Sequence, residues 1–148
     1  MRLHYTIFAD AAEVAQSGKL GMLGGNVDVL RLPTFPALVS PLVAVISVDV
    51  DVAEADSLHQ VYLELISPVG QNLLPKQVAA FSPLSNSPES AELPLRYLFI
   101  ANLGGLIVPA AGMHWLRIVV DDAEVGKVPL LVLNAPTLEE PGANQRER

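Results

Sequence analysis

Apolar and polar residues alternate with a period of two along most of this chain. The clearest run covers residues 42–51, where every second residue from Leu42 to Val50 is apolar and the residues between them change from valine to serine and aspartate. Successive side chains of a β-strand point to opposite faces of its sheet. The run therefore predicts a strand with one face in the core and a far end that reaches water. Shorter alternating runs predict further strands at residues 3–8, 27–32, 60–66, 95–103, 113–120 and 125–133.

Turn-forming residues separate these runs. Residues 67–70, Ser-Pro-Val-Gly, predict a tight turn, because proline presets the second turn position and glycine accepts the closing geometry. The Asp-Asp-Ala-Glu sequence of residues 121–124 predicts the turn of a last hairpin, and the Gly-Gly-Asn sequence of residues 24–26 predicts another hairpin connection. Residues 33–41 begin and end with proline, which predicts a loop.

Three segments carry weaker signals. Residues 11–16 predict a helical turn or a loop, and residues 72–80 predict a strand that Pro75 confines to a sheet edge or a bulge. Residues 82–94 contain three prolines and four serines, and we expect them to form a mobile surface loop.

The fold class follows from the number and spacing of the strands. About eight or nine strands begin roughly 8–12 residues apart, and no helical period extends beyond two turns, which is typical of a sandwich or barrel. We expect an all-β fold, a two-sheet antiparallel β-sandwich, over residues 1–134. Residues 135–148 are polar and end in charged residues, which predicts a disordered C-terminal tail.

Composition excludes several classes of function. With 148 residues, of which 51% are apolar and 17% charged, the chain can bury a core of its own. It contains no cysteine, so disulfides, thiolate zinc sites and cysteine nucleophiles are excluded. A net charge of −7 with nine Lys and Arg residues argues against nucleic acid or an anionic membrane as a partner. The glycines at 21–25 and 104–105 lack the Lys-Ser/Thr of a phosphate loop, so we expect no cofactor.

The apolar stretches bear on location. The first ten residues lack the apolar run of a secretory signal, and the longest apolar stretches, at residues 42–48 and 128–133, are far shorter than the roughly 20 residues of a membrane span. We therefore expect a cytoplasmic protein without a transmembrane segment.

Two regions carry a family resemblance. The first holds Ala-Asp-Ala-Ala at residues 9–12, Gly-Lys-Leu at 18–20 and Leu-Gly-Gly at 23–25, and the second is Gly-Met-His-Trp-Leu-Arg-Ile at 112–118. In these residues the chain resembles a family of short bacterial proteins that is classed as a domain of unknown function. Members usually have an aromatic residue where this chain has Met113. The resemblance implies a bacterial cytoplasmic β domain and assigns no catalytic or binding residue.

Four acidic residues are the sharpest candidates for a metal site. Asp49 and Asp51 end the strand at residues 42–51, and Glu54 and Asp56 follow in the next loop. Carboxylate oxygens of this kind bind divalent cations such as Ca²⁺. The spacing lacks the glycine and terminal glutamate of a helix-loop-helix calcium site, so a solvated loop is the competing interpretation. The acidic residues at 121, 122 and 124 are explained by turn chemistry.

The histidines and aromatic residues give no catalytic pattern. His4, His59 and His114 lie on different predicted strands without a second histidine two or four residues away, and we expect them at surface or half-buried positions. No serine lies in a nucleophile elbow, so we expect no catalytic residues, although convergence of carboxylates and histidines in space stays open. The aromatic residues of the central strands are expected in the core, or alternatively on an exposed contact face: Tyr62, Tyr97, Phe99 and Trp115.

Some predicted strands are apolar on both faces. Residues 95–103 and 128–133 are the clearest cases. A two-sheet sandwich leaves one face of each sheet in water, so a second apolar face needs a cover. The leading hypothesis is a non-enzymatic protein-interaction or assembly module, either a homo-oligomer or the partner of another protein. The alternative is a small-molecule-binding or divalent-metal-binding β domain that uses residues 49–56 or a pocket between the sheets.

Overall fold

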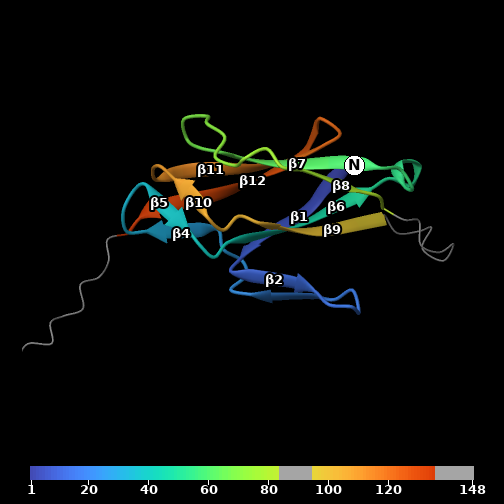
Figure 1. Cartoon of the computed structure of the whole chain (residues 1–148), viewed down its shortest axis with the longest axis horizontal. Helices are drawn as coiled ribbons and strands as arrows, with labels where there is room; N and C mark the ends of the chain where they lie inside the picture. Colours follow the sequence, from blue (N-terminus) through green and yellow to red (C-terminus); the bar gives the residue numbers. More distant parts are fainter. Residues whose placement is uncertain (84–94, 136–148) are drawn as a thin grey trace, which may run out of the picture.

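The computed structural model describes residues 1–83 and 95–135, which form β-strands, one short 3-10 helix and no α-helix (Figure 1). The all-β prediction is therefore confirmed. The predicted mobile loop at residues 82–94 and the predicted tail at 135–148 lie outside the described residues, apart from residues 82, 83 and 135. The elements are β1 (Arg2–Ala9), β2 (Ala11–Val14), β3 (Leu20–Leu23), β4 (Val29–Leu32), β5 (Ala37–Val39), β6 (Val43–Val50), η1 (Val52–Glu54), β7 (His59–Ile66), β8 (Val78–Phe81), β9 (Leu95–Asn102), β10 (Leu106–Val108), β11 (Gly112–Val120) and β12 (Ala123–Asn134).

Strand β6 is the centre of a three-stranded antiparallel sheet with the order β1-β6-β9. On its inner face Ala44, Ile46 and Val48 are fully buried, as the alternation predicts. The strand reaches water only after Val50, which is also buried. Strands β6 and β9, which correspond to two of the longest predicted strands, pair along their whole length.

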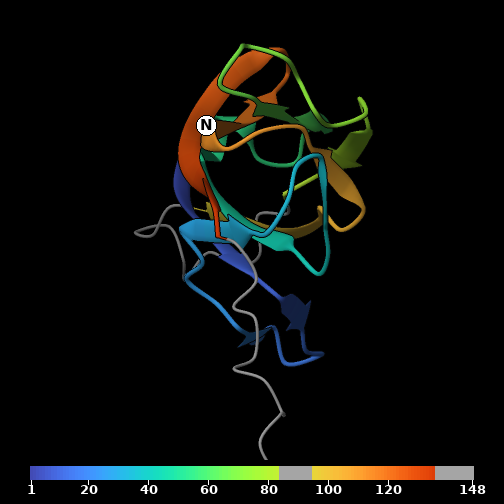
Figure 2. The ribbon, with the colours of Figure 1, turned by 90° about the vertical axis from the view of Figure 1, so that its left-hand side faces the viewer.

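A five-stranded sheet packs against that inner face. Its order is β4-β12-β11-β7-β8, and Figure 2 shows that it curls around the core. Leu65, Leu116 and Leu130 supply fully buried side chains from its three central strands. The core therefore lies between the two large sheets.

The last hairpin, which joins β11 to β12, is confirmed. Asp121 and Asp122 form its turn with φ values of 49° and 63°, and Val120 pairs with Ala123 across them. Two successive residues with positive φ give the type I′ turn that matches the twist of a β-hairpin, and aspartate tolerates this conformation better than most residues.

The two-sheet sandwich of eight or nine strands is not confirmed. The described residues form twelve strands in four sheets, because β2 and β3, and likewise β5 and β10, form separate two-stranded sheets. Strand β5 lies within the predicted loop at residues 33–41, where Ala37 and Val39 are buried. A strand of three residues is too short to show a period of two. The prolines of residues 33–41 were therefore the stronger local signal, and they predicted a loop.

The prediction of a helical turn or loop at residues 11–16 is wrong. Residues 11–14 form β2, which pairs with β3 across the turn at Gly18. Alanine and glutamate favour helices, so local propensity pointed away from a strand that cross-strand pairing creates. The hairpin connection predicted at residues 24–26 is also wrong, because β4 pairs in parallel with β12 and not with β3.

The two large sheets approach each other closely at one edge. There a Cβ atom on Gly126 of β12 would collide with the side chain of Leu3 on β1. At the other edge, the ladders found among the described residues do not join β8 to β9, although the rings of Phe81 and Tyr97 stack at a centroid distance of 4.5 Å. Among the described residues no ladder joins β1 to β12 either, so the edges differ in how closely the backbones approach: β1 and β12 lie close together, whereas β8 and β9 meet through side chains.

Candidate interaction surface

A two-stranded hairpin extends from the end of β1. We call residues 11–23, which comprise β2, its turn and β3, the hairpin arm. Ala12 pairs with Met22 and Val14 with Leu20, so these four apolar side chains share one face. Figure 1 shows the arm beyond the three-stranded sheet, on the side away from the five-stranded sheet. The arm thus carries a wholly apolar face outside the core.

The apolar side chains of the hairpin arm are poorly covered. Val14 is 47% exposed and Met22 is 40% exposed, while Ala12 and Leu20 are half-buried. Leu23, on the other face of the arm, is 72% exposed. Single exposed apolar residues are common on protein surfaces, whereas Val14 and Met22 lie on the same face of the hairpin arm.

The base of the hairpin arm is fixed by short-range contacts. The backbone N–H of Asp10 donates to the carbonyl of Leu23 at 3.0 Å. Gly24 has a φ of +61°, and the Asp10 carboxylate occupies the space that a Cβ atom at Gly24 would need. The arm therefore leaves the body of the molecule at a defined position.

The face of the three-stranded sheet that points toward the hairpin arm is also apolar. We call it the outer sheet face, and its rows follow from the strand register, with Ile7, Val45 and Ile100 in one row and Tyr5, Ser47 and Leu98 in the next. Val45 and Ser47 are buried on the central strand, whereas the side chains on both flanking strands are only half-buried. This confirms that β9 is apolar on both faces.

A buried carboxylate ends the outer sheet face. Asp49 accepts hydrogen bonds from Nε of Arg96 at 3.1 Å and from Nε of Arg2 at 3.3 Å. Burial disfavours the charged carboxylate, but the two guanidinium groups and nearby His4 outweigh this and lower the pKa of Asp49. The first residue of the predicted metal site is therefore paired with cations of the chain itself.

Of the other three candidate metal ligands, Asp51 and Glu54 lie together beside the amino group of Met1, which is 3.7 Å from Oδ2 of Asp51. Glu54 accepts a hydrogen bond from the amino group of Met1 at 2.8 Å and one from the backbone N–H of Asp51. The side chain of Asp51 is largely exposed, and Asp56 has a φ of 59° in a turn. Within residues 1–83 and 95–135, no group of three or more His, Asp or Glu side chains is arranged to hold a metal ion. The described residues therefore contain no cluster of side chains that supports the predicted metal site.

His59 is buried, so the prediction of a surface or half-buried position is wrong for it. Its Nδ1 lies 2.6 Å from Oδ2 of Asp121, and its Nε2 lies 2.7 Å from the carbonyl of Glu54. Burial disfavours the imidazolium, but these two acceptors outweigh it and raise the pKa of His59 above its ordinary value of 6.5. The backbone N–H of Gln60, followed by His59, lowers the pKa of Asp121. Through these contacts His59, the first residue of β7, connects η1 to the last hairpin turn. Each nitrogen of its ring lies within hydrogen-bond distance of an oxygen.

His114 is fully buried as well, again contrary to the prediction. Its Nδ1 lies 3.0 Å from the carbonyl of Gly112, and its Nε2 has no hydrogen-bond partner among the described residues. His4 is partly exposed near Asp49. The three histidines thus have different hydrogen-bond and charge partners.

The aromatic residues divide between the core and the surface. Tyr97 and Phe99 pack against the core, as expected. Trp115 instead is 37% exposed, and Nζ of Lys127 lies 5.1 Å from its ring centroid. Trp115 lies on the face of β11 opposite the buried His114 and Leu116, as the period of two requires. Its large aromatic side chain alone had suggested a position in the core.

Sequence reasoning identified the second apolar face of β9 but missed the hairpin arm. The available signal was the alternation of Ala12 and Val14 with Glu13, followed across a Ser-Gly turn by the apolar Leu20 and Met22. Each strand has only four residues, so the alternation was too short to outweigh helix propensity.

Comparison with known proteins gives a family and no function. A model of a family of unknown function matches residues 4–133, which confirms the resemblance to a domain-of-unknown-function family. No curated protein and no solved structure matches the chain significantly. Among the described residues, no helix has the length and apolar character to span a membrane.

Proposed function

Since the chain belongs to the family of unknown function DUF6941, its role has to be inferred from its surfaces, and we propose that it is a non-enzymatic assembly module. It forms homo-oligomers in which the hairpin arm of one copy packs on the outer sheet face of another. The family resemblance and the absence of cysteine suit a bacterial cytoplasmic protein, and we place the assembly there.

One observation carries this proposal: a single chain presents two apolar surfaces that its own fold leaves partly uncovered. Val14 and Met22 are exposed on the apolar face of the arm, and Leu98 and Ile100 are half-buried on the sheet. Complete burial of one such side chain stabilises a complex by about 1.5–3 kcal/mol. Several of them together offset the cost of association, which is about 4–15 kcal/mol.

A second copy of the chain is the occupant that needs the fewest assumptions. Because both surfaces lie on the same chain, two copies related by a two-fold axis bury both surfaces twice. A two-stranded hairpin is also only marginally stable in water, so the arm gains stability when a partner covers its apolar face.

The test is the molar mass of purified protein, measured by size-exclusion chromatography with light scattering. At micromolar concentration we expect the unmodified chain at twice its monomer mass of 15.8 kDa or higher. Met22→Glu places a charge on the apolar face of the arm, so the variant should run as a monomer and dissociate at least tenfold more readily. A monomeric unmodified chain contradicts the proposal.

Two further variants make the result specific. Leu98→Glu on the outer sheet face should weaken assembly like Met22→Glu, because each removes one side of the same contact. Val69→Glu is the matched control, since Val69 is 86% exposed in the turn before β8 and lies on neither surface. Assembly that survives both arm and sheet variants would place the contact elsewhere.

A further inference from the structure

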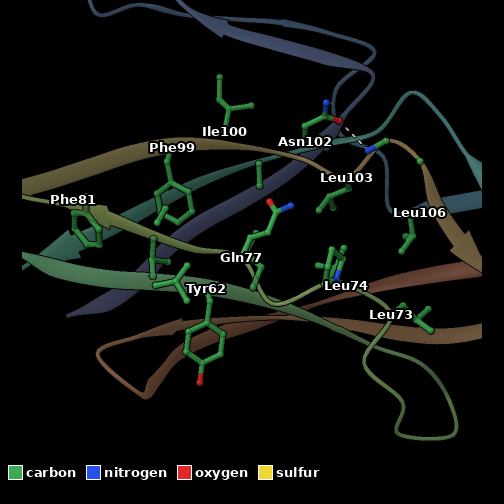
Figure 3. A pocket seen from close by; sticks show the side chains of 18 of the residues that line it. Tyr62, Leu73, Leu74, Gln77, Phe81, Phe99, Ile100, Asn102, Leu103 and Leu106 are labelled. Atoms are coloured by element: carbon green, nitrogen blue, oxygen red, sulfur yellow. Dashed lines mark hydrogen bonds between the residues drawn. The ribbon is translucent and has the colours of Figure 1, made fainter.

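The core is open along the edge where β8 and β9 part. A cavity of about 720 Å³ lies there between the two large sheets, bounded by β7, β8, β9 and the segments that precede β8 and follow β9 (Figure 3). Ligand sites in proteins commonly have volumes of about 300–1,000 Å³. The cavity therefore has the size of a small-molecule site.

Side chains that face the core remain incompletely covered in this cavity. Leu63, Leu74 and Phe99 line it and are only half-buried, although each packs against the core. Figure 3 shows Phe81 and Phe99 at one end of the cavity and Leu73, Leu74 and Leu106 toward the other. The long axis of the cavity is thus lined by apolar side chains from end to end.

The lining carries no ionisable Asp, Glu, Lys, Arg or His side chain among the described residues. Its polar side chains are Tyr62, Gln77, Tyr97 and Asn102, and the ring of Tyr97 stacks on that of Phe81. In Figure 3, Tyr62 points away from the cavity, and Oδ1 of Asn102 accepts a hydrogen bond from Gly104 at 2.9 Å. Gln77 projects into the space between the sheets, where its amide can bind one polar group of a ligand.

We propose that this cavity binds an elongated, uncharged apolar molecule with one hydroxyl or amide group, of the chemical class of a long-chain alcohol. The apolar lining takes the hydrocarbon chain, and the amide of Gln77 binds the polar end. A carboxylate of the same length is disfavoured, because the described lining offers its charge no cationic partner and Gln77 offers only an uncharged amide.

The experiment measures displacement of the neutral fluorescent probe N-phenyl-1-naphthylamine from the full chain at pH 8. We expect the probe to bind, 1-dodecanol to displace it, and dodecanoate to displace it at least tenfold more weakly. Failure of the probe and of dodecanol to bind would overturn the proposal. Equal or tighter binding of dodecanoate would also overturn it, because the lining offers that ligand no cation.

Two variants locate the binding. Ala101→Phe adds a ring to the inner face of β9 within the cavity and should weaken dodecanol binding at least tenfold. Ala53→Phe is the matched control on an exposed alanine outside the lining and should leave binding unchanged. If Ala101→Phe fails to fold, Gln77→Leu at an exposed position decides the question, since it should remove the preference for dodecanol over dodecane. A preference that persists in Gln77→Leu contradicts the assigned polar contact.

This inference does not rest on the proposed assembly, and Ile100 is the residue of the outer sheet face named above that also belongs to the lining. The hairpin arm does not contribute to the lining, so Met22→Glu should become monomeric and still bind dodecanol with unchanged affinity. Loss of binding in that variant would contradict a site contained within one copy of the chain.

Discussion

At the scale of single residues, buried polar groups hold together parts of the chain that are distant in sequence. His59 and Asp121 are 62 positions apart, yet their side chains meet at 2.6 Å. The Glu54 carbonyl accepts from the other ring nitrogen, so the charged imidazolium satisfies both acceptors at once. These contacts position η1 beside the last hairpin turn and have a structural role.

The raised pKa of His59 makes stability depend on pH. Because the folded chain binds this proton more tightly than the unfolded chain, the interaction contributes fully below pH 6.5 and is lost as the pH rises through the raised pKa. We expect the free energy of unfolding, measured with urea, to fall between pH 6 and pH 9.

His59→Gln tests the origin of this pH dependence. The substitution should cost about 1.5–3 kcal/mol at pH 6, the range for hydrogen bonds of a charged group, and should flatten the change between pH 6 and pH 9. His4→Gln is the matched control, because His4 is partly exposed and outside the His59 contacts, and it should keep the pH dependence. An unchanged pH profile in His59→Gln would assign the effect to other groups.

At the scale of elements, the close approach of β1 and β12 closes one side of the molecule. Gly126 permits this approach, because any Cβ atom there would overlap Leu3 near its own Cβ atom. Leu3 is part of a paired strand and cannot move away without shifting β1. The glycine is thus required by packing between strands and not by a turn.

Gly126→Ala should therefore lower the free energy of unfolding by about 1–3 kcal/mol, the usual cost of overpacking. Chemical denaturation measures the change. Gly21→Ala is the matched control in another strand, where the nearest atom to the new Cβ would lie at 3.6 Å, and we expect it to be tolerated. If the two substitutions lowered the free energy of unfolding equally, the cause would be strand propensity and not the contact between β1 and β12.

At the scale of the whole molecule, net charge opposes the proposed assembly. Each copy carries a formal charge of −7, so two copies repel each other at low ionic strength. The proposed contact is apolar and gains nothing from opposite charges. We therefore expect the charge repulsion between two copies to weaken their self-association, and added salt to screen this repulsion.

We therefore expect the dissociation constant of the homo-oligomer to fall as NaCl is raised from 50 mM to 500 mM, because the shorter Debye length screens the repulsion. Analytical ultracentrifugation at both salt concentrations measures it. Dissociation at high salt would instead indicate an interface held by ion pairs, contrary to the apolar contact proposed.

The sequence by itself determined the all-β class, most of the long strands and the last hairpin. These features depend on local geometry: the two-residue period follows from the pleat of each strand, and the turn at Asp121 and Asp122 follows from residues that tolerate positive φ. The second apolar face of β9 could also be predicted, because it depends only on consecutive residues of one strand.

Only the tertiary structure decided the pairing of the strands, the burial of the polar residues and the cavity. The parallel pairing of β4 with β12, the burial of His59 and the opening between β8 and β9 each join residues far apart in the chain. Short strands such as β2 and β5 carry too few residues for a local signal. Their conformation is set by the partners they pair with, and those contacts form only when the whole chain folds.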